Sequence, residues 1–259
     1  MPPDTIKEWL EKGVVNYNQS SFIEADPISI PHQYSKQQDI EISGFFAAIM
    51  AWGQRVTIIN KANELMKLMD NAPFDFIKNH SAKERLRFNS FKHRTLQPDD
   101  VIYLVEVLQV YFQNKNSLED AFADYLKNGD DDTFNALAGF HSHLFSHDWV
   151  MERTRKHIST PVNKSSCKRL NMYLRWMVRQ DDRGVDFGLW KRISPSQLVI
   201  PLDLHVGRVA RQLGLLARTN NDWQAAKELT MELRKFDAED PVKYDFALFG
   251  EGVLGNFGV

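Results

Sequence analysis

A lysine at the start of a predicted helix is the first residue whose type could do covalent chemistry. Lys168 opens the segment KRLNMYLRWMVR, and Asn171 and Arg175 follow it on one face at i+3 and i+7. Ser165 is predicted to cap this helix, which would place the Lys168 amine near the positive end of the helix dipole. A neutral lysine amine can attack an electrophilic carbon and form an imine, so Lys168 is a candidate nucleophile.

Asp203 is the second candidate, in the segment IPLDLHVGRVARQLGL. Pro201 favours an extended entry, and the apolar spacing after Asp203 predicts a helix. An aspartate immediately before a helix is a favoured N-cap, which is the simplest interpretation. A capping carboxylate is also held rigidly and stays ionised, so it could face a developing cation. The two interpretations are compatible.

The segment around Asp203 resembles a known signature. PLDLHVGRVARQLGL is similar to the pattern PVDTHVxRVxxRLGL of the helix-hairpin-helix base-excision DNA glycosylases. The resemblance implies that Asp203 is catalytic and that Lys168 is the nucleophile found in bifunctional members. The gap of 35 residues between them is similar to that of the archaeal 8-oxoguanine DNA glycosylase (AGOG) branch. The whole sequence looks closest to a bacterial family of uncharacterised proteins related to these enzymes.

Two further segments carry the resemblance and imply a pocket for the base. FFAAIMAWGQRVTIINKANELM is similar to a helix pair of these glycosylases and places Gln54 where a polar side chain fills the space of an extruded base. DPVKYDFALFGEGVLG resembles the C-terminal helix of the archaeal branch, where Asp245 and Phe249 would help hold the base. Asn171, on the Lys168 face, is predicted to line the same pocket.

One departure concerns the hairpin that gives these glycosylases their name. Its pattern LPGVGxxTA is absent, and TPVNKSSCKRL stands in its place without a glycine. In the family those glycines allow backbone amides to approach a DNA phosphate closely. Side chains would have to supply the phosphate contacts here, and the candidates are Lys164, Ser165, Ser166, Arg175, Arg208 and Arg211.

The charge distribution also favours a nucleic-acid partner. The whole chain has a formal net charge of only -2, but residues 151–218 carry 14 Lys and Arg against 5 Asp and Glu. A basic segment in an otherwise acidic chain concentrates attraction for phosphates on one part of the surface. The alternative is a set of unrelated solvated faces.

A histidine cluster offers a competing class of enzyme. HSHLFSHDW contains His143 and His147 at i, i+4, together with His141 and Asp148, and a His-Asp pair is typical of metal-dependent HD phosphohydrolases. No second element with metal-ligand spacing stands out, so we expect no metal and no cofactor. The lone Cys167 excludes internal disulfides, four-cysteine zinc sites and a cysteine-ligated iron–sulfur cluster.

The elements that must position these residues are helices. Apolar residues recur at helical spacing in four stripes, and no run has a clear strand period; the stripes are Ile42, Phe45, Phe46, Ile49 and Met50; Val101, Leu104, Val105, Leu108 and Phe112; Cys167, Leu170, Leu174, Met177 and Val178; and Val206, Val209, Ala210 and Leu213. We predict an all-α, two-lobed, glycosylase-like fold with a central lobe of about 39–149. The second lobe would join 1–38 to 150–259, and a cleft between the lobes would hold the extruded base.

These observations predict a DNA-repair glycosylase with AP lyase activity that removes an oxidised purine, similar to 8-oxoguanine, from damaged duplex or single-stranded DNA. The alternative is a non-catalytic nucleic-acid-binding relative on the same scaffold. The longest uncharged apolar stretch, Ile42–Gly53, has 12 residues, too short for a membrane span. We expect a cytoplasmic protein without a membrane partner, and a monomer.

Overall fold

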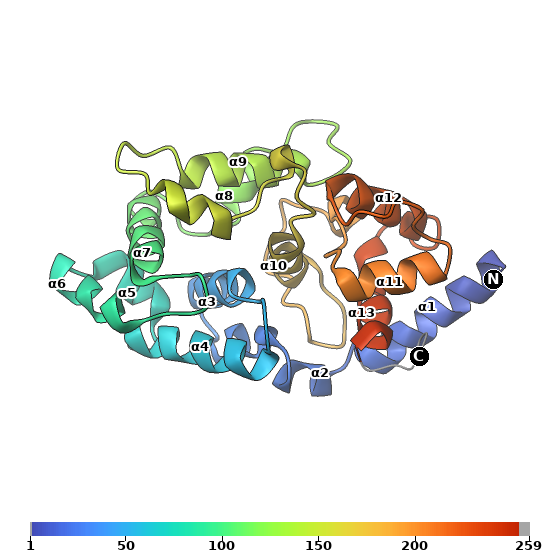
Figure 1. The fold of residues 1–259 in the computed structure, drawn as a ribbon, viewed down its shortest axis with the longest axis horizontal. Helices are drawn as coiled ribbons and strands as arrows, with labels where there is room; N and C mark the ends of the chain where they lie inside the picture. The colour runs from blue at the N-terminus through green and yellow to red at the C-terminus, as the bar shows by residue number, and fades with distance from the viewer. Residues whose placement is uncertain (1, 254–259) are drawn as a thin grey trace. The chain divides into compact units, whose positions relative to one another are not determined.

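The computed structural model describes residues 2–253, and the regular elements in that range are all helical (Figure 1). The predicted all-α fold class is therefore confirmed. The thirteen α-helices of the described range are α1 (Pro3–Tyr17), α2 (Ser20–Glu24), α3 (Gln37–Ile49), α4 (Arg55–Leu68), α5 (Pro73–Asn79), α6 (Ala82–Arg85), α7 (Pro98–Phe112), α8 (Asp120–Ala123), α9 (Phe134–Leu144), α10 (Lys168–Val178), α11 (Leu204–Gln212), α12 (Trp223–Arg234) and α13 (Asp245–Val253). Short 3₁₀ helices connect them at Pro27–Ser29, Pro31–Gln33, Leu86–Ser90, Glu152–His157, Pro161–Asn163, Pro195–Gln197 and Pro241–Tyr244.

The chain divides into two compact units. Unit 1 comprises Met1–Phe22, Lys127–Asn135 and Thr160–Val259, and unit 2 comprises Ile23–Leu126 and Ala136–Ser159. Compared with the predicted lobes, residues 23–38 and 150–159 lie in unit 2, and 127–135 lie in unit 1. The predicted cleft between lobes stays a prediction.

The core of unit 2 is built on α3 and α7. Residues 40–50, which include most of α3, are all buried, because this helix is apolar on nearly every side. The predicted stripe from Val101 to Phe112 is buried as well. Glu41 is the charged residue among the buried positions of α3, and its carboxylate accepts hydrogen bonds from the Ser117 hydroxyl (2.6 Å) and the Leu118 amide (2.9 Å). Its buried charge is thereby compensated.

Unit 1 packs α13 between α1 and α11, with glycines at both contacts. A Cβ added to Gly13 of α1 would lie 2.5 Å from the Cβ of Ala247 in α13. One added to Gly252 would lie 2.9 Å from the Cβ of His205 in α11. Both positions therefore need a residue without a side chain, because the backbones of paired helices approach closely there.

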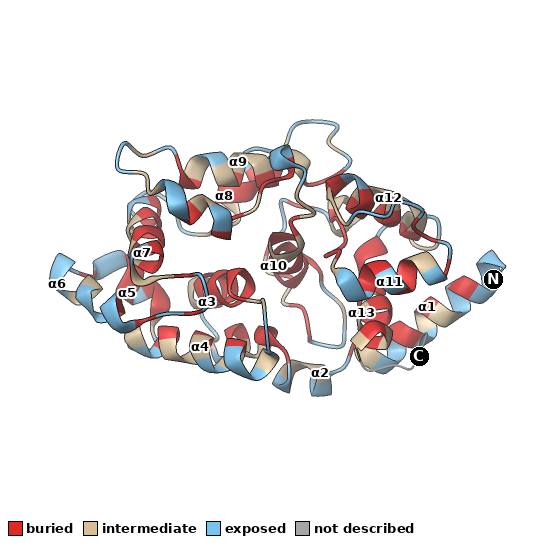
Figure 2. Ribbon diagram, in the orientation of Figure 1, coloured by how far each residue is buried: buried red, intermediate tan, exposed pale blue. Residues whose placement is uncertain are grey.

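The helix that begins with Lys168 is buried almost completely (Figure 2). Every residue of α10 from Leu170 to Val178 is buried, including Asn171 and Arg175. The predicted apolar stripe of α10 is confirmed, but its polar face points into the protein as well. Within residues 2–253, no helix is both long enough and apolar enough to cross a bilayer.

Candidate active site

Lys168 is the first residue of α10, and an unusual loop delivers it there. The loop begins with the 3₁₀ turn Pro161–Asn163, after which Lys164 adopts a left-handed backbone with φ 61°. Cys167, directly before Lys168, is also left-handed with φ 50° and is fully buried. Such φ values usually require glycine or asparagine. Two non-glycine residues thus adopt a conformation typical of the glycines that the sequence lacks.

The predicted cap of α10 is wrong by two residues. The N-cap is Cys167, which makes no capping hydrogen bond with its side chain. Ser165 still supports the turn, since its hydroxyl accepts a hydrogen bond from the Cys167 amide at 3.1 Å. The left-handed backbone at Cys167 starts the helix two residues later than the serine pattern indicates.

Asp203 caps α11 as the sequence predicts, and it does so with one oxygen. Oδ1 accepts hydrogen bonds from the amides of His205 and Val206, both at 2.9 Å. Oδ2 lies 4.0 Å from the Lys168 Nζ, and both side chains are mostly but not fully buried, 20% and 25% exposed. One oxygen of the carboxylate therefore caps α11, and the other faces the lysine amine.

Three hydrogen bonds tie together the loops that carry this pair. The Ser166 hydroxyl donates to the Leu202 carbonyl at 3.2 Å, directly before Asp203. The Asn221 amide group donates to the Asp203 carbonyl at 2.9 Å, and the Trp223 amide donates to the Lys164 carbonyl at 3.1 Å. The start of α10 and the start of α11 are thereby fixed to the same framework in unit 1.

Asp245, the first residue of α13, is a buried carboxylate beside the pair. Its Oδ2 accepts a 2.5 Å hydrogen bond from Arg175 Nη1. Burial raises the pKa of Asp245 to about 6; the Arg175 charge opposes this shift, the Asp203 charge adds to it, and the Lys168 charge opposes it. Asp245 therefore lies within the electrostatic field of both predicted catalytic residues. Its protonation state changes close to neutral pH.

Arg175 is not a surface residue, and the prediction that it contacts a DNA phosphate does not fit its position. It is 3% exposed and forms ion pairs with Asp245 (2.5 Å) and Asp186 (3.3 Å). Its guanidinium also lies 4.4 Å from the centre of the Phe246 ring. Arg175 is thus an internal cation that holds Asp245 in place rather than a phosphate contact.

Arg179, one turn after Arg175, extends this buried ion network. It pairs with Asp181 (2.8 Å), Asp186 (3.0 Å) and Asp240 (2.8 Å). Asp186 and Asp240 were not predicted from the sequence as part of the site. The sequence signal for such partners was the pair of arginines at i, i+4 on a helix whose other face is apolar. If both faces of that helix are buried, the arginines require carboxylate partners.

Two buried acceptor atoms near Lys168 have no hydrogen-bond donor among the described residues. The Asn171 amide donates to the Ser166 carbonyl at 3.0 Å, but its Oδ1 has no partner. Oδ1 of Asp245 likewise has none. Buried acceptors are normally satisfied, so these two atoms are exceptions among the buried polar groups of unit 1.

The other two predicted pocket residues lie in different units. Phe249 is half-buried in α13 of unit 1, where its ring meets the edge of the Phe22 ring at 6.5 Å. Gln54 belongs to unit 2, where it is the exposed N-cap of α4 and makes no side-chain capping bond. A shared role with Lys168 stays a prediction for Gln54.

The remaining phosphate candidates lie at or near the surface of unit 1. Lys164 and Arg208 are exposed, while Ser165, Ser166 and Arg211 are partly exposed. Arg208 donates to the Gly252 carbonyl at 2.8 Å, and Arg211 donates to the Asn221 side-chain oxygen at 2.6 Å. Neither bond neutralises the charge of its arginine, so both cations remain attractive to an anion.

The positive balance of residues 151–218 is smaller on the surface than in the sequence. Several of its cations pair with carboxylates that lie outside the segment, at Asp100, Asp222, Asp240 and Asp245. A count over 151–218 misses these partners, because Asp222 lies four residues beyond the segment and Asp100, Asp240 and Asp245 come from more distant parts of the chain.

The histidine cluster is explained by packing. His143 contacts the Tyr125 hydroxyl at 3.3 Å, His147 stacks on Trp149 at 4.8 Å, and His141 lies against Phe145 at 4.9 Å. Among residues 2–253, no group of three or more His, Cys, Asp or Glu side chains could hold a metal ion. No observation therefore favours the phosphohydrolase interpretation.

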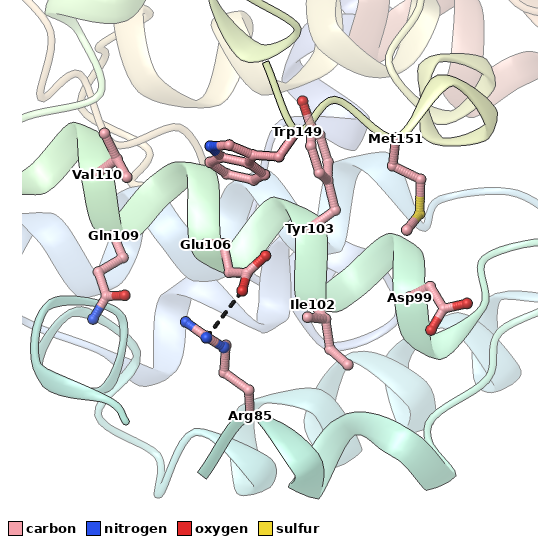
Figure 3. Close-up of a pocket in the computed structure, with 9 residues that line it drawn as sticks. All are labelled: Arg85, Asp99, Ile102, Tyr103, Glu106, Gln109, Val110, Trp149 and Met151. Carbon is pink, nitrogen blue, oxygen red and sulfur yellow. Dashed lines mark ion pairs between the residues drawn. The ribbon is translucent and has the colours of Figure 1, made fainter. Parts of the chain in front are cut away.

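A separate cavity of about 480 Å³ lies in unit 2 (Figure 3). One face of α7 lines it, together with Arg85 of α6 and the Trp149–Met151 segment. Arg85 and Glu106 form an ion pair of 3.1 Å across it. None of the predicted site residues lines this cavity, so it lends no support to the lysine and aspartate chemistry.

Comparison with known proteins identifies a family and nothing finer. No curated protein and no solved structure matches the chain at a significant level. The sequence profile described as "Protein of unknown function (DUF2400)" matches residues 26–254, which include the Lys168 helix, Asp203 and Asp245. The chain therefore belongs to the DUF2400 family.

Proposed function

We propose that this protein is a DNA glycosylase with AP lyase activity that removes an oxidised purine from DNA. The observation that carries the proposal is the Lys168–Asp203 pair, in which one carboxylate oxygen caps a helix and the other faces the lysine amine at 4.0 Å. An amine beside a rigid carboxylate suits a reaction that develops positive charge on a sugar carbon.

The chemistry follows from these two groups. When the glycosidic bond breaks, its electron pair leaves with the base, the base takes up a proton, and positive charge develops at the sugar carbon C1′. Asp203 stabilises that charge. The Lys168 amine bonds to C1′ and loses a proton, and the sugar ring opens to give the imine. Removal of a C2′ proton then expels the 3′ phosphate, and water hydrolyses the imine to free Lys168.

Asp245 has a role in this scheme because Lys168 must lose a proton before it attacks. Asp245 lies in the field of Lys168, and burial raises its pKa to about 6. The charge on Asp245 would therefore change the electrostatic environment in which Lys168 gives up its proton. A base that entered beside Lys168 would meet acceptors without partners in Oδ1 of Asp245 and Oδ1 of Asn171.

The test is covalent trapping with borohydride on oligonucleotides that contain single oxidised purines. We expect the wild type to be trapped through Lys168, and Lys168→Gln to lose trapping and strand cleavage while it still binds lesion DNA. Lys164→Gln is the matched control, because it removes a lysine from the same loop and should still be trapped. Absence of trapping on every oxidised purine, or full trapping of Lys168→Gln, would contradict the proposal.

The second candidate function is nucleic-acid binding without catalysis. It is favoured by the two cap bonds of Asp203, which give this residue a sufficient structural reason to be present. The binder is expected to bind DNA without trapping on any substrate, so the same assay separates the two functions.

A further inference from the structure

The cavity of about 480 Å³ in unit 2 is a groove over one face of α7 (Figure 3). Its residues from α7 run from Asp99 to Val110 at i, i+3, i+4, i+7, i+10 and i+11. This spacing places them on one face of the helix, which extends for about 16 Å, because each residue adds about 1.5 Å to a helix. Figure 3 shows Arg85 of α6 on one side of this face and Trp149 on the other. We call this cavity the α7 groove.

The α7 groove exposes apolar side chains. Trp149 is 45% exposed and Val110 is 48% exposed, and Ile102 and Met151 are partly exposed beside them. The opposite face of α7, with the stripe from Val101 to Phe112, is already buried in the core. A helix that needs only one apolar face for its own fold thus presents a second one to the outside, and such exposed patches are typical of interaction sites.

The aromatic side chains of the groove are held in place before any partner binds. The Tyr103 ring stacks on the Phe145 ring at 5.7 Å, and its hydroxyl donates to the Leu144 carbonyl at 2.7 Å. The Trp149 ring meets the Tyr103 ring at 5.4 Å and stacks on the His147 ring at 4.8 Å. A tryptophan that is already fixed loses little conformational entropy on binding, so Trp149 suits the role of an interface anchor.

The charge at the groove that has no internal partner is negative. Asp99 lines the groove, is exposed and forms no ion pair within residues 2–253. Asp148, directly before Trp149, is also exposed and has no ion pair in that range. The arginine that lines the groove, Arg85, is already paired with Glu106 at 3.1 Å. The groove therefore attracts a cation and repels phosphate groups, which favours a basic protein segment over a nucleic acid.

The form of the groove favours a helical segment. Side chains that recur at three- and four-residue spacing along one helix face form the surface on which a second helix packs. An apolar stripe on that second helix would cover Trp149 and Val110. A Lys or Arg beside the stripe would then meet the carboxylate of Asp99 at the start of α7.

We propose that the α7 groove binds an amphipathic helix of a partner protein that carries Lys or Arg beside its apolar stripe. The exposed apolar side chains select the stripe, and the unpaired carboxylates select the basic residues. The proposal does not rest on the proposed function, because none of the residues of the lysine and aspartate chemistry lines the groove.

The probe is a fluorescein-labelled synthetic helical peptide with leucines at heptad spacing and lysines beside them. Fluorescence anisotropy measures its affinity for the full chain. We expect Trp149→Ala to weaken binding by at least about tenfold, because the variant loses the main apolar anchor. Asp99→Asn should weaken binding by about two- to fivefold and make it less sensitive to salt, because one exposed charge is lost. A peptide with glutamate in place of every lysine should bind at least about tenfold more weakly.

Two matched controls lie in unit 2 outside the groove. Val56 is 71% exposed, and Glu24 is exposed without an ion pair within residues 2–253, so Val56→Ala and Glu24→Gln should bind the peptide as the wild type does. Val110→Ser tests the groove without a change to the packed Trp149 ring. It alters a half-exposed side chain, so the fold should be kept while peptide binding weakens by about threefold or more.

No binding of the lysine peptide, equal binding of the glutamate peptide, or unchanged affinity in both Trp149→Ala and Val110→Ser would overturn the proposal. Displacement of the peptide by micromolar spermine would overturn it as well, since the groove would then be a site for a small polyamine. A dimer in sedimentation that Trp149→Ala abolishes would also overturn it, because the groove would then be covered by a second copy of this chain.

Discussion

The two oxygens of Asp203 do different work, and substitutions can separate them. Asparagine caps a helix as well as aspartate, so Asp203→Asn should keep the two cap bonds while it loses the charge that faces Lys168. We expect a stability close to that of the wild type and a loss of at least about a hundredfold in base excision.

Asp203→Ala is the companion variant. It should lose the same activity and also about 1 kcal/mol of unfolding free energy, because the cap is gone. Single-turnover excision and urea unfolding measure the two effects. Full activity of Asp203→Asn would show that this residue is only a cap.

Asp245 makes stability depend on pH in an unusual direction for a carboxylate. Its pKa is raised from 3.8 to about 6, chiefly by burial, so the folded state holds the proton more tightly than the unfolded state. The stabilisation from this proton is complete below about pH 3.8 and is lost as the pH rises towards 6. We expect wild-type unfolding free energy to fall across this window by up to about 3 kcal/mol relative to Asp245→Asn. Urea unfolding at pH 4, 5, 6 and 7 measures it; parallel curves for the two proteins would contradict the assignment.

At the scale of elements, α10 is the helix whose surroundings matter most. Arg175 and Arg179 form ion pairs with carboxylates from three segments. Asp186 lies in the loop after α10, Asp240 in the turn before α13, and Asp245 in α13 itself. Removal of one partner leaves the others buried with unbalanced charge, which is far more costly than the loss of a surface pair.

Arg175→Gln should therefore destabilise the protein by about 3–5 kcal/mol, since Asp186 and Asp245 would both lose a buried partner. Arg183→Gln is the control, because Arg183 is an exposed arginine a few residues further on, and its loss should change stability by less than about 0.5 kcal/mol. Chemical denaturation compares the two. Equal, small effects would mean that the network does not hold α10.

The predictability of these elements had a clear limit. The apolar stripes of α3, α7, α10 and α11 could be predicted, because buried residues on a helix recur at a spacing of three to four positions in the sequence. The cap at Asp203 was readable for the same reason, as it depends on residues two and three positions away. The position of Arg175 was not readable, because its partners are up to 70 residues distant and only the fold brings them together.

At the scale of the whole molecule, the charge of a sequence stretch does not give the charge of the surface that it forms. The basic stretch 151–218 spans both units, and some of its cations form ion pairs with carboxylates outside the stretch. The two units also differ from the predicted lobes in their limits. Residues 127–135 belong to unit 1, although the stretches on both sides of them belong to unit 2.

The different contacts of the two Asp203 oxygens also bear on how a protein with this fold can evolve. Because only Oδ1 is needed to begin α11, a single substitution to asparagine would remove the proposed chemistry and leave the fold intact. Descendants that abandoned catalysis could therefore persist as intact DNA-binding proteins without any compensating change. Among relatives of this chain, asparagine at this position beside an intact lysine helix would mark such a descendant.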